Sequence, residues 1–428
     1  MGADSADRFI GLSQGCFLIM RVLIITSTPP YPAQQGGALR VSGIVHGLHQ
    51  HGHEVTLLCF VEEANPAKYA PLKAITQRIE TVPMPARSKT DRLRDLAFST
   101  RPDIAGRLDS LDMRECLRRL IAEQDFDIIQ FEGIEMAIYL PFVRELKDQK
   151  LTRAALIYDS FNAEAALQRI IAAVEKRDIK RLPMAIYSQI QAGRIGRFER
   201  QICQSADAVI AVSAEDAAAM GECAAGKPIH ILASGIDTSE YATHPQKLDL
   251  GEQVLVFTGK MDYRPNVDAM LWFTGEVLPR VQSRHPDVKL YIVGQKPHTL
   301  LDVLRTKPNI EITGWVPHVQ PYLHAASIYV APLRMGSGTR LKLLEAMASR
   351  CAIVATNIAA TGLSDRVRAA LCLADDAEAQ AAAIARLLTN ADERDQMGTQ
   401  LQRLAEQEYD WRALTPALIN IYREIGLG

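Results

Sequence analysis

The sequence predicts an α/β protein made of two Rossmann-like domains that face each other across a cleft. Short, almost wholly apolar β-rich runs alternate with helical stretches, and this pattern is typical of parallel sheets covered on both faces. The alternation restarts after a polar stretch at residues 237–252. The length of 428 residues also suits two domains of ordinary size.

The first half of the chain contains candidate strands separated by amphipathic segments. The strands are expected at residues 21–26, 54–60, 127–131, 154–159, 207–212 and 228–232, and helical segments at 38–50 and 163–203. We expect residues 20–236 to form the N-terminal domain. Residues 1–19 are expected to be a disordered extension without a structural role.

The second half repeats this organisation. Its strands are expected at residues 254–259, 289–294, 310–315, 327–332 and 352–356, each followed by a helical pattern. We expect residues 237–409 to form the C-terminal domain. The amphipathic segment at 410–428 is predicted to be a helix that packs back on the N-terminal domain.

Composition excludes several classes of protein. Hydrophobic residues make up 48% and charged residues 23%, the balance of a globular protein rather than a disordered or fibrous one, and the net charge is only −2. The seven cysteines form no CxxC pair, which indicates reduced, buried thiols rather than disulfides or a zinc site. No apolar run approaches the ~20 residues that span a bilayer. We therefore expect a cytoplasmic protein without a nucleic-acid partner.

Three local patterns resemble catalytic or metal-binding motifs but lie in the wrong context. GLSQG at 11–15 matches a GxSxG nucleophile, yet no strand precedes it. Asp125 and Asp127 have a metal-binding spacing but directly precede a buried strand. The histidines between His46 and His53 span a helix end, a turn and a strand, so they diverge in direction. We expect no metal site.

The loop after the first expected strand ends in Gly36 and Gly37, at the start of a helix. Two glycines in this position let backbone N–H groups approach an anion closely. The pattern is not GxGxxG, so the indication of a nicotinamide cofactor is weak. A plain turn from loop into helix accounts for the same glycines equally well.

The second half contains a sharper signal, APLRMGSGTRLKLLEAMA. A strand ends before the glycine-rich loop at 336–338, and a helix is expected to begin near Thr339. Arg340 and Lys342 fall in its first turn, where cations oppose the helix dipole unless an anion lies in front of them. A bound diphosphate would remove that conflict. The alternative is a surface-charged amphipathic helix.

These motifs resemble those of the retaining glycosyltransferases of family 4, which have the GT-B fold, and the resemblance runs from Met20 to the carboxyl terminus. The motifs FTGxMDYxPN and GTRLKxLEAMA are similar to those of sugar transferases associated with exopolysaccharides. The resemblance implies that Glu345 binds the ribose of a nucleotide. It also implies that Gly338 and Thr339 offer backbone N–H groups to the diphosphate.

The chain departs from the family pattern at two places. Ser337 stands where many relatives have a glutamate that contacts the sugar, so the identity of the sugar stays open. In GKMDYRPN, Lys260 takes the place of an arginine and Pro265 that of a lysine, while Arg264 lies one residue early. Our hypothesis is that Arg340 and Lys342 take over part of the phosphate binding.

Other candidate residues follow expected strands. Phe161-Asn162-Ala163-Glu164 resembles a His-Asn-x-Glu run of relatives, and Asn162 and Glu164 are expected to face the cleft. A plain helix cap with Glu164 in the first turn is an equal alternative. Trp315 and Val316 fall near the nucleobase position of relatives, although a buried core tryptophan is the safer expectation.

The function predicted on this basis is hexosyl transfer from a nucleoside-diphosphate-sugar to a glycan or lipid-linked acceptor, with retention and without a metal or other cofactor. The residues assigned to catalysis are Asn162, Glu164, Lys260 and Arg340. Those assigned to donor binding are Gly36, Gly37, Arg264, Trp315, Val316, Gly336, Ser337, Gly338, Thr339, Lys342 and Glu345.

Two further questions stay open at this point. The basic segments 86–101 and 176–200 fit either peripheral contact with the inner face of a membrane or solvated helix faces. The alternative functions are a sugar-nucleotide epimerase of the same fold and a degenerate nucleotide-binding module. Formation of an epimer without an acceptor would support the epimerase. Nucleotide binding without turnover of a sugar donor would support the degenerate module.

Overall fold

The computed structural model describes residues 19–33, 36–63, 65–86, 88, 101–175, 182–336 and 341–426. The chain forms two compact units. Unit 1 extends to Leu232 and includes Thr415–Gly428, and unit 2 comprises Ala233–Leu414. The sequence prediction had placed these divisions after residues 236 and 409.

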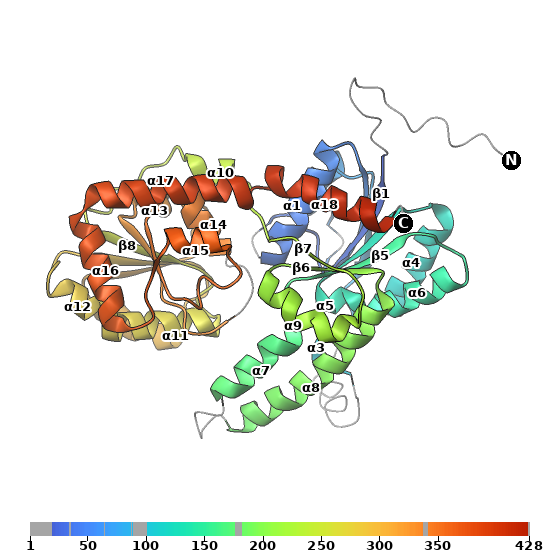
Figure 1. Cartoon of the computed structure of the whole chain (residues 1–428), viewed down its shortest axis with the longest axis horizontal. Coiled ribbons are helices and arrows are strands. Elements are labelled where there is room, and N and C mark those ends of the chain that lie inside the picture. The colour runs from blue at the N-terminus through green and yellow to red at the C-terminus, as the bar shows by residue number, and fades with distance from the viewer. Residues whose placement is uncertain are drawn as a thin grey trace. The chain divides into compact units, whose positions relative to one another are not determined.

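Unit 1 is built on a seven-stranded sheet in which every strand pair is parallel (Figure 1). The strand order is β3-β2-β1-β4-β5-β6-β7. The strands are β1 Arg21–Thr26, β2 Glu54–Val61, β3 Arg78–Pro83, β4 Ile128–Glu132, β5 Ala155–Ser160, β6 Ala208–Ala211 and β7 Ile229–Ile231. Sequence analysis missed β3, since RIETVP is a half-exposed edge strand with charged residues and a proline rather than an apolar run.

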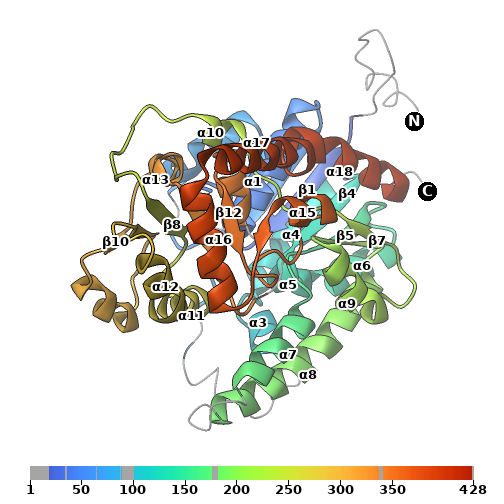
Figure 2. The same ribbon diagram turned by 60° about the vertical axis from the view of Figure 1, so that its left-hand side comes forward.

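Helices cover the sheet of unit 1. They are α1 Gly36–Gln50, η1 Pro66–Ala74, α3 Asp103–Gly106, α4 Leu111–Glu123, α5 Gly133–Met136, η2 Ala137–Tyr139, α6 Leu140–Asp148, α7 Glu164–Glu175, α8 Leu182–Ser205 and α9 Ala214–Ala224. The segment predicted as helical at 163–203 comprises α7 and α8, which lie side by side as a hairpin (Figures 1 and 2).

Unit 2 repeats the plan with a six-stranded parallel sheet of order β10-β9-β8-β11-β12-β13. The strands are β8 Val254–Thr258, β9 Lys289–Val293, β10 Ile310–Gly314, β11 Ile328–Ala331, β12 Ile353–Ala355 and β13 Cys372–Leu373. Strand β13 was missed because two half-buried residues leave no readable pattern.

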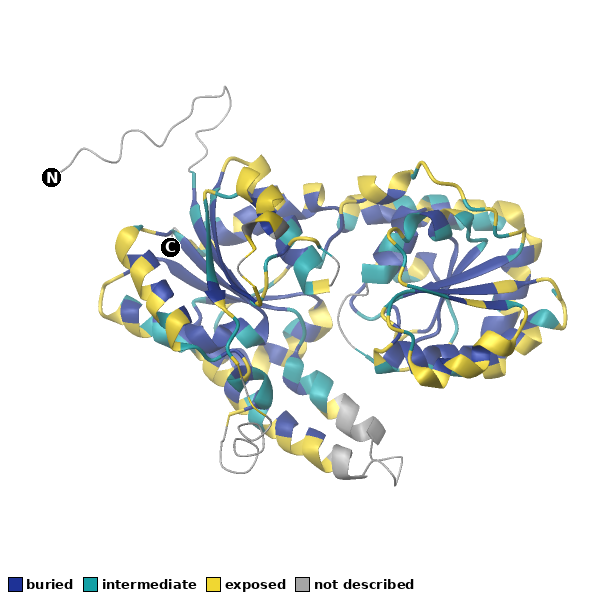
Figure 3. Ribbon diagram, turned by 180° about the vertical axis from the view of Figure 1, so that it is seen from behind, coloured by how far each residue is buried: buried dark blue, intermediate teal, exposed yellow. Residues whose placement is uncertain are grey.

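Helices α16 and α12 pack together on one face of this sheet, and α14 and α17 pack together on the other (Figure 1). The helices of unit 2 are α10 Ser239–Ala242, α11 Arg264–Trp272, η4 Phe273–Val277, α12 Leu278–Gln282, η5 Thr299–Thr306, α13 Gln320–Ala325, α14 Leu341–Ala348, α15 Asp365–Ala370, α16 Ala377–Thr389 and α17 Ala391–Glu408. The last helix, α18 Trp411–Gly426, corresponds to the segment predicted at 410–428. The central strands of each unit are buried beneath their helices, as Figure 3 shows, whereas the edge strands are partly exposed.

Both sheets have the same strand order around their first strand. Strand β1 lies between β2 and β4, and β8 lies between β9 and β11. The chain therefore leaves two neighbouring strands in opposite directions. In open α/β sheets this switch point, at the carboxyl ends of the strands, is where ligands bind.

A buried network of polar side chains lies at the carboxyl ends of β4 and β5. Arg40, only 1% exposed, donates two hydrogen bonds of 2.9 Å to the Asp159 carboxylate and a third, of 3.0 Å, to the carbonyl of Leu232. Burial and the Asp159 charge raise the pKa of Glu132 well above its ordinary value. The network thus combines one ion pair with a carboxyl group that favours its neutral form.

The same network anchors α18 to unit 1. Tyr422 Oη donates a 2.5 Å hydrogen bond to Gln130 Oε1, and Gln130 Nε2 donates to Glu132 Oε1 at 2.7 Å. Tyr422 is completely buried. The carboxyl-terminal helix is therefore part of the core of unit 1, although unit 2 separates it from the rest of that unit in the chain.

A second polar cluster joins the two segments at which the chain enters and leaves unit 2. Ile236 and Asp410 form a parallel bridge, and Asp410 Oδ2 accepts from the backbone N–H and the hydroxyl of Thr238 at 3.1 and 2.6 Å. Arg412 donates to both carboxylate oxygens at 2.8 Å. Although burial opposes it, this set of donors lowers the pKa of Asp410 to about 2.

The described residues agree with two further features of the composition. Their six cysteines are free, and all but the half-buried Cys372 are buried. Across the described ranges, no helix combines the length and the apolar character needed to cross a membrane.

We predict that Asp410→Asn destabilises the protein by about 1–3 kcal/mol, because the variant loses the charge-assisted bonds to Arg412 and Thr238. The folded pKa of about 2 lies below the unfolded value of about 3.9, so this stabilisation is present above pH ~4 and is lost as the pH falls towards 2. Thermal unfolding from pH 7 to pH 2 measures it. The gap in Tm between wild type and variant should shrink in acid, and exposed Asp287→Asn is the matched control. A gap that does not depend on pH contradicts the assignment.

Candidate active site

The strongest candidate site in unit 2 lies at the carboxyl ends of β8 and β11, and we call it the β8–β11 edge. Its residues are Gly259, Lys260 and Asn266 after β8, and Lys342 and Glu345 on α14. Helices α11 and α14 begin after these neighbouring strands, and neither has an acidic residue in its first turn. The first turns of both helices thus contain no carboxylate to interact with the positive end of the helix dipole.

Lys342 is held close to the loop that follows β8. Its Nζ donates to Asn266 Oδ1 at 2.8 Å and lies 4.4 Å from the centroid of the Phe257 ring. Asn266 is 4% exposed and donates through Nδ2 to the carbonyl oxygen of Lys260 at 2.9 Å. A Cβ on Gly259 would lie 2.8 Å from both Asn266 Nδ2 and Lys342 Nζ, so this position requires a glycine.

Lys260 and Arg264 belong to the same loop and helix start. The Lys260 side chain is 47% exposed, with Nζ 3.5 Å from Asp262 Oδ1. Arg264 is the first residue of α11. The structure thus brings Lys260 and Lys342 to one edge through Asn266, which sequence analysis quoted within its motif without giving it a role.

Glu345 lies on α14, three residues after Lys342. Its carboxylate accepts a 3.1 Å hydrogen bond from Tyr241 Oη on α10. Burial raises the pKa of Glu345, while this hydrogen bond and the Lys342 charge act in the opposite direction. Sequence analysis missed Tyr241 because it treated 237–252 as a polar separator. The one signal was an aromatic residue within that stretch.

Four residues of the glycine-rich signal, Ser337, Gly338, Thr339 and Arg340, lie outside the described residues. Gly336, just before them, has a φ of 124°, a conformation that favours glycine. Their predicted contacts with a diphosphate stay predictions.

Trp315 and Val316 follow β10, the edge strand, three positions across the sheet from β11. Trp315 is 63% exposed, so the expectation of a buried core tryptophan is wrong. The reason is that the chain has already left the sheet at Gly314. Val316 packs partly buried against the core of unit 2.

In unit 1 the corresponding switch point lies after β1 and β4. Gly36 and Gly37 begin α1, and Gly133 follows β4 with a φ of 73°. A Cβ on Gly37 or Gly133 would lie 3.0 or 3.1 Å from Cε2 of Phe161. A side chain at either position would therefore crowd this ring, and the φ of Gly133 also favours glycine. The predicted anion contact of Gly36 and Gly37 stays a prediction.

Asn162 and Glu164 lie together at the end of β5. Asn162 Nδ2 donates to Glu164 Oε1 at 3.2 Å, and Glu164 is the first residue of α7. The start of this helix is held by two other carboxylates: Asp216 accepts from the N–H of Ala163 at 2.9 Å, and Glu199 from the N–H of Glu164 at 3.1 Å. Glu164 therefore lies in the first turn of α7, as the alternative interpretation of a plain helix cap predicts. Its side chain is also paired with Asn162.

Burial raises the pKa of these acidic groups in unit 1. It raises the pKa of Glu164, and the nearby charges of Glu135 and Asp216 raise that pKa further. It also raises the pKa of Glu199 to about 7. Carboxyls with raised pKa values hold a proton closer to neutral pH, as acid–base groups of enzymes do. Sequence analysis missed Glu199 because it considered the segment 176–200 only for its basic character.

The patterns dismissed as metal motifs have structural roles. His53 Nδ1 accepts from the N–H of Met20 at 3.2 Å, and burial lowers its pKa to about 4. Asp127 accepts from the N–H of Arg21 at 2.7 Å, next to the start of β4. Among the described residues, no group of three or more His, Cys, Asp or Glu side chains is placed to hold a metal ion. Residues 11–15 lie outside the described ranges.

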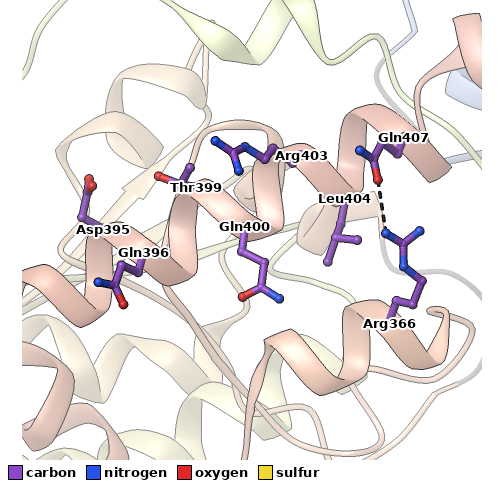
Figure 4. Close-up of a pocket in the computed structure, with 8 residues that line it drawn as sticks. All are labelled: Arg366, Asp395, Gln396, Thr399, Gln400, Arg403, Leu404 and Gln407. Atoms are coloured by element: carbon purple, nitrogen blue, oxygen red, sulfur yellow. Dashed lines mark hydrogen bonds between the residues drawn. The ribbon is translucent and has the colours of Figure 1, made fainter.

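A groove of about 750 Å³ lies between α15 and α17 of unit 2 (Figure 4). Arg366 of α15 reaches Gln407 of α17 across it, with Nη2 and Oε1 3.3 Å apart. None of the predicted site residues lines this groove.

Comparisons with known proteins agree with this architecture. Residues 35–233 match the model "Glycosyl transferase 4-like domain", and residues 252–390 match "Glycosyl transferases group 1". The phosphatidyl-myo-inositol mannosyltransferase of Mycolicibacterium smegmatis is 25% identical over 413 residues, which cover 92% of each chain. An uncharacterized 44.6 kDa protein in the cps region of Klebsiella pneumoniae is 22% identical over 377 residues, 83% of this chain and 88% of that one.

Among solved structures, Anabaena HepE in complex with UDP and glucose superposes with a TM-score of 0.60 at 14% identity, covering 95% of this chain and all of that one. Two parallel sheets with matching strand order and the two family models lead to one assignment. The chain belongs to the glycosyltransferases with the GT-B fold.

We predict that Glu199→Gln removes a pH dependence from stability. The folded pKa of about 7 lies above the unfolded value of about 4.3, so the stabilisation is complete below the unfolded pKa and is lost as the pH rises through 7. Glutamine stays neutral and still offers an oxygen to the N–H of Glu164. Between pH 5 and 8 the Tm of the wild type should fall relative to the variant, by on the order of 5 °C. Glu222→Gln, at an exposed position on α9, is the control. Parallel Tm profiles for wild type and Glu199→Gln would contradict the assignment.

Proposed function

We propose that the protein transfers a sugar from a nucleoside-diphosphate-sugar to the hydroxyl of a glycan or lipid-linked acceptor, with retention of the anomeric configuration and without a cofactor. The observation that carries this proposal is the β8–β11 edge. There Lys342, Lys260 and the partly buried Glu345 gather at the switch point of the sheet, beside two helix starts free of acidic residues.

In this proposal the β8–β11 edge binds the donor. Negative charge grows on the diphosphate as the sugar leaves, and Lys260 and Lys342 stabilise it electrostatically. Arg264, at the start of α11, adds positive charge. The Glu345 carboxylate accepts hydrogen bonds from the ribose hydroxyls. The contacts proposed for residues 336–340 and for Trp315 and Val316 complete the donor site of unit 2.

The acceptor is proposed to bind at Asn162 and Glu164 of unit 1. These side chains are partly exposed at the carboxyl end of β5 and paired with each other. The donor phosphate takes the acceptor proton in a same-face attack, so no carboxylate nucleophile is required. The raised pKa of Glu164 suits a group that hydrogen-bonds an acceptor hydroxyl.

A polysaccharide or a lipid-linked intermediate is the proposed acceptor class. One similar protein is named for phosphatidyl-myo-inositol and another lies in a cps region. Ile186 and Ile190 of α8 are exposed by 55% and 45% within the basic segment 176–200, which supports contact with an anionic membrane surface at the cytoplasmic side. No observation on the described residues favours the epimerase or the degenerate module.

We predict that Glu345→Ala weakens binding of the cognate nucleotide on the order of 10–100-fold, because hydrogen bonds to a charged group contribute ~1.5–3 kcal/mol. Thermal shifts with UDP, GDP and ADP and their sugar conjugates identify the nucleotide and measure the loss. Glu276→Ala, an exposed glutamate of unit 2, is the matched control. A wild type that binds none of these nucleotides, or a variant that binds as the wild type does, contradicts the proposal.

We also predict that an α-linked donor gives an α-linked product. Proton NMR of the anomeric signal, recorded early in the reaction with the donor that binds, distinguishes the two anomers. A β-linked first product rules out retention. An epimerised donor formed without acceptor would move the assignment to the epimerase.

A further inference from the structure

Asn266 occupies an unusual position at the β8–β11 edge, since both ends of its amide are engaged by different parts of unit 2. Nδ2 donates to the carbonyl oxygen of Lys260 at 2.9 Å, and Oδ1 accepts from Lys342 Nζ at 2.8 Å. Lys260 lies six residues away in the chain and Lys342 seventy-six. The amide therefore links the loop after β8 to the helix after β11.

The geometry requires an amide at this position. Asn266 must donate at one end and accept at the other, which aspartate and leucine of similar size cannot do. A flipped amide would place its NH₂ group against an ammonium and its oxygen against a carbonyl. The backbone N–H of Asn266 donates to the carbonyl of Tyr263 at 2.9 Å, so the start of α11 fixes where the side chain begins.

The surroundings of Asn266 leave little freedom to the Lys342 ammonium. Gly259 lies against both the amide and the ammonium, and the Phe257 ring lies 4.4 Å from Nζ. The amide and the ring are neutral groups, and the charge of Lys342 also acts on the Glu345 carboxylate of the same helix. The partly exposed Lys260 is held at its backbone by the same amide, which leaves its side chain to extend from a fixed point.

We propose that Asn266 is a positioning residue, which holds Lys342 and the Lys260 loop in place as one binding unit for the diphosphate of the donor. This inference rests on the proposed function and adds a residue with no previous role. Positioned cations stabilise a leaving group more than mobile ones do, because no reorganisation is needed when charge develops. Asn266 thus acts on the phosphates through the two lysines and not on the nucleoside.

The test compares ligands with and without phosphates. The nucleotide that binds the wild type and its parent nucleoside are used as competitors of the transfer reaction. In Asn266→Ala, we expect about a tenfold weaker inhibition by the nucleoside diphosphate, an unchanged inhibition by the nucleoside, and a fall in kcat. Asn309→Ala is the control, at a half-buried asparagine of unit 2 that also donates to a backbone carbonyl, that of Pro286, and it should match the wild type. An equal loss for nucleoside and nucleoside diphosphate would show a merely structural role and overturn the proposal.

A double-mutant cycle tests whether Asn266 acts through Lys342. In a Lys342→Met background, Asn266→Ala should cost much less affinity for the diphosphate than it does in the wild type. Asn266→Asp should bind the diphosphate more weakly than Asn266→Ala, since its carboxylate pairs with Lys342 and neutralises it. Additive effects, or an aspartate variant that binds as well as wild type, overturn the proposal.

The outcomes separate this inference from the proposed function. A wild type that neither binds nucleotides nor transfers sugar refutes both, whereas an active wild type with an unaffected Asn266→Ala refutes only the role of Asn266. Tm values without ligand show whether each variant is folded. If Asn266→Ala does not fold, Asn266→Ser gives the same comparison, because its hydroxyl is too short to reach both partners.

Discussion

The arrangement of the candidate sites depends on one constraint: every strand pair described in the two sheets is parallel. The carboxyl ends of all strands in a sheet then lie along one edge. Because β1 and β8 each lie between the second and the fourth strand of their sheet, the chain diverges there and leaves room for a ligand. The lysines lie in the loop after β8 and on the helix after β11, and the glycines, Asn162 and Glu164 lie in the loops or at the helix starts after β1, β4 and β5. The parallel topology thus brings the candidate functional residues of each unit to one edge of its sheet.

The second constraint is that a charged side chain in the core needs a partner of opposite charge. Arg40 and Asp159 are almost fully buried and bind each other through two hydrogen bonds, so removing either would leave an uncompensated charge in the core. Tyr422 connects α18 to the same network through Gln130. The carboxyl-terminal helix is consequently required to complete unit 1. Asp410 plays a comparable part in unit 2, since it ties together the segments by which the chain enters and leaves.

The two units offer complementary chemistry. The β8–β11 edge provides the ammonium groups of Lys260 and Lys342, which suit a diphosphate, whereas the end of β5 provides carboxyl groups with raised pKa values, which suit hydroxyl groups. A glycosyltransferase needs both environments. The departures from the family pattern fit this view, because Lys342, held by Asn266, places an ammonium beside the start of α11, where Pro265 stands in place of a lysine of that pattern.

The sequence by itself determined most strands, since long apolar runs indicate burial on both faces. It singled out Lys342 because a cation at a helix start is a local conflict, and Glu345 through the resemblance of its motif to a known family. It missed β3 and β13, whose residues are too polar or too few to form a pattern. Only the tertiary structure decided which residues meet: Asn266 with Lys342, Tyr241 with Glu345 and Arg40 with Asp159, at separations of 76, 104 and 119 residues. Such contacts depend on strand order and helix placement, which the periodicity of a single segment does not encode.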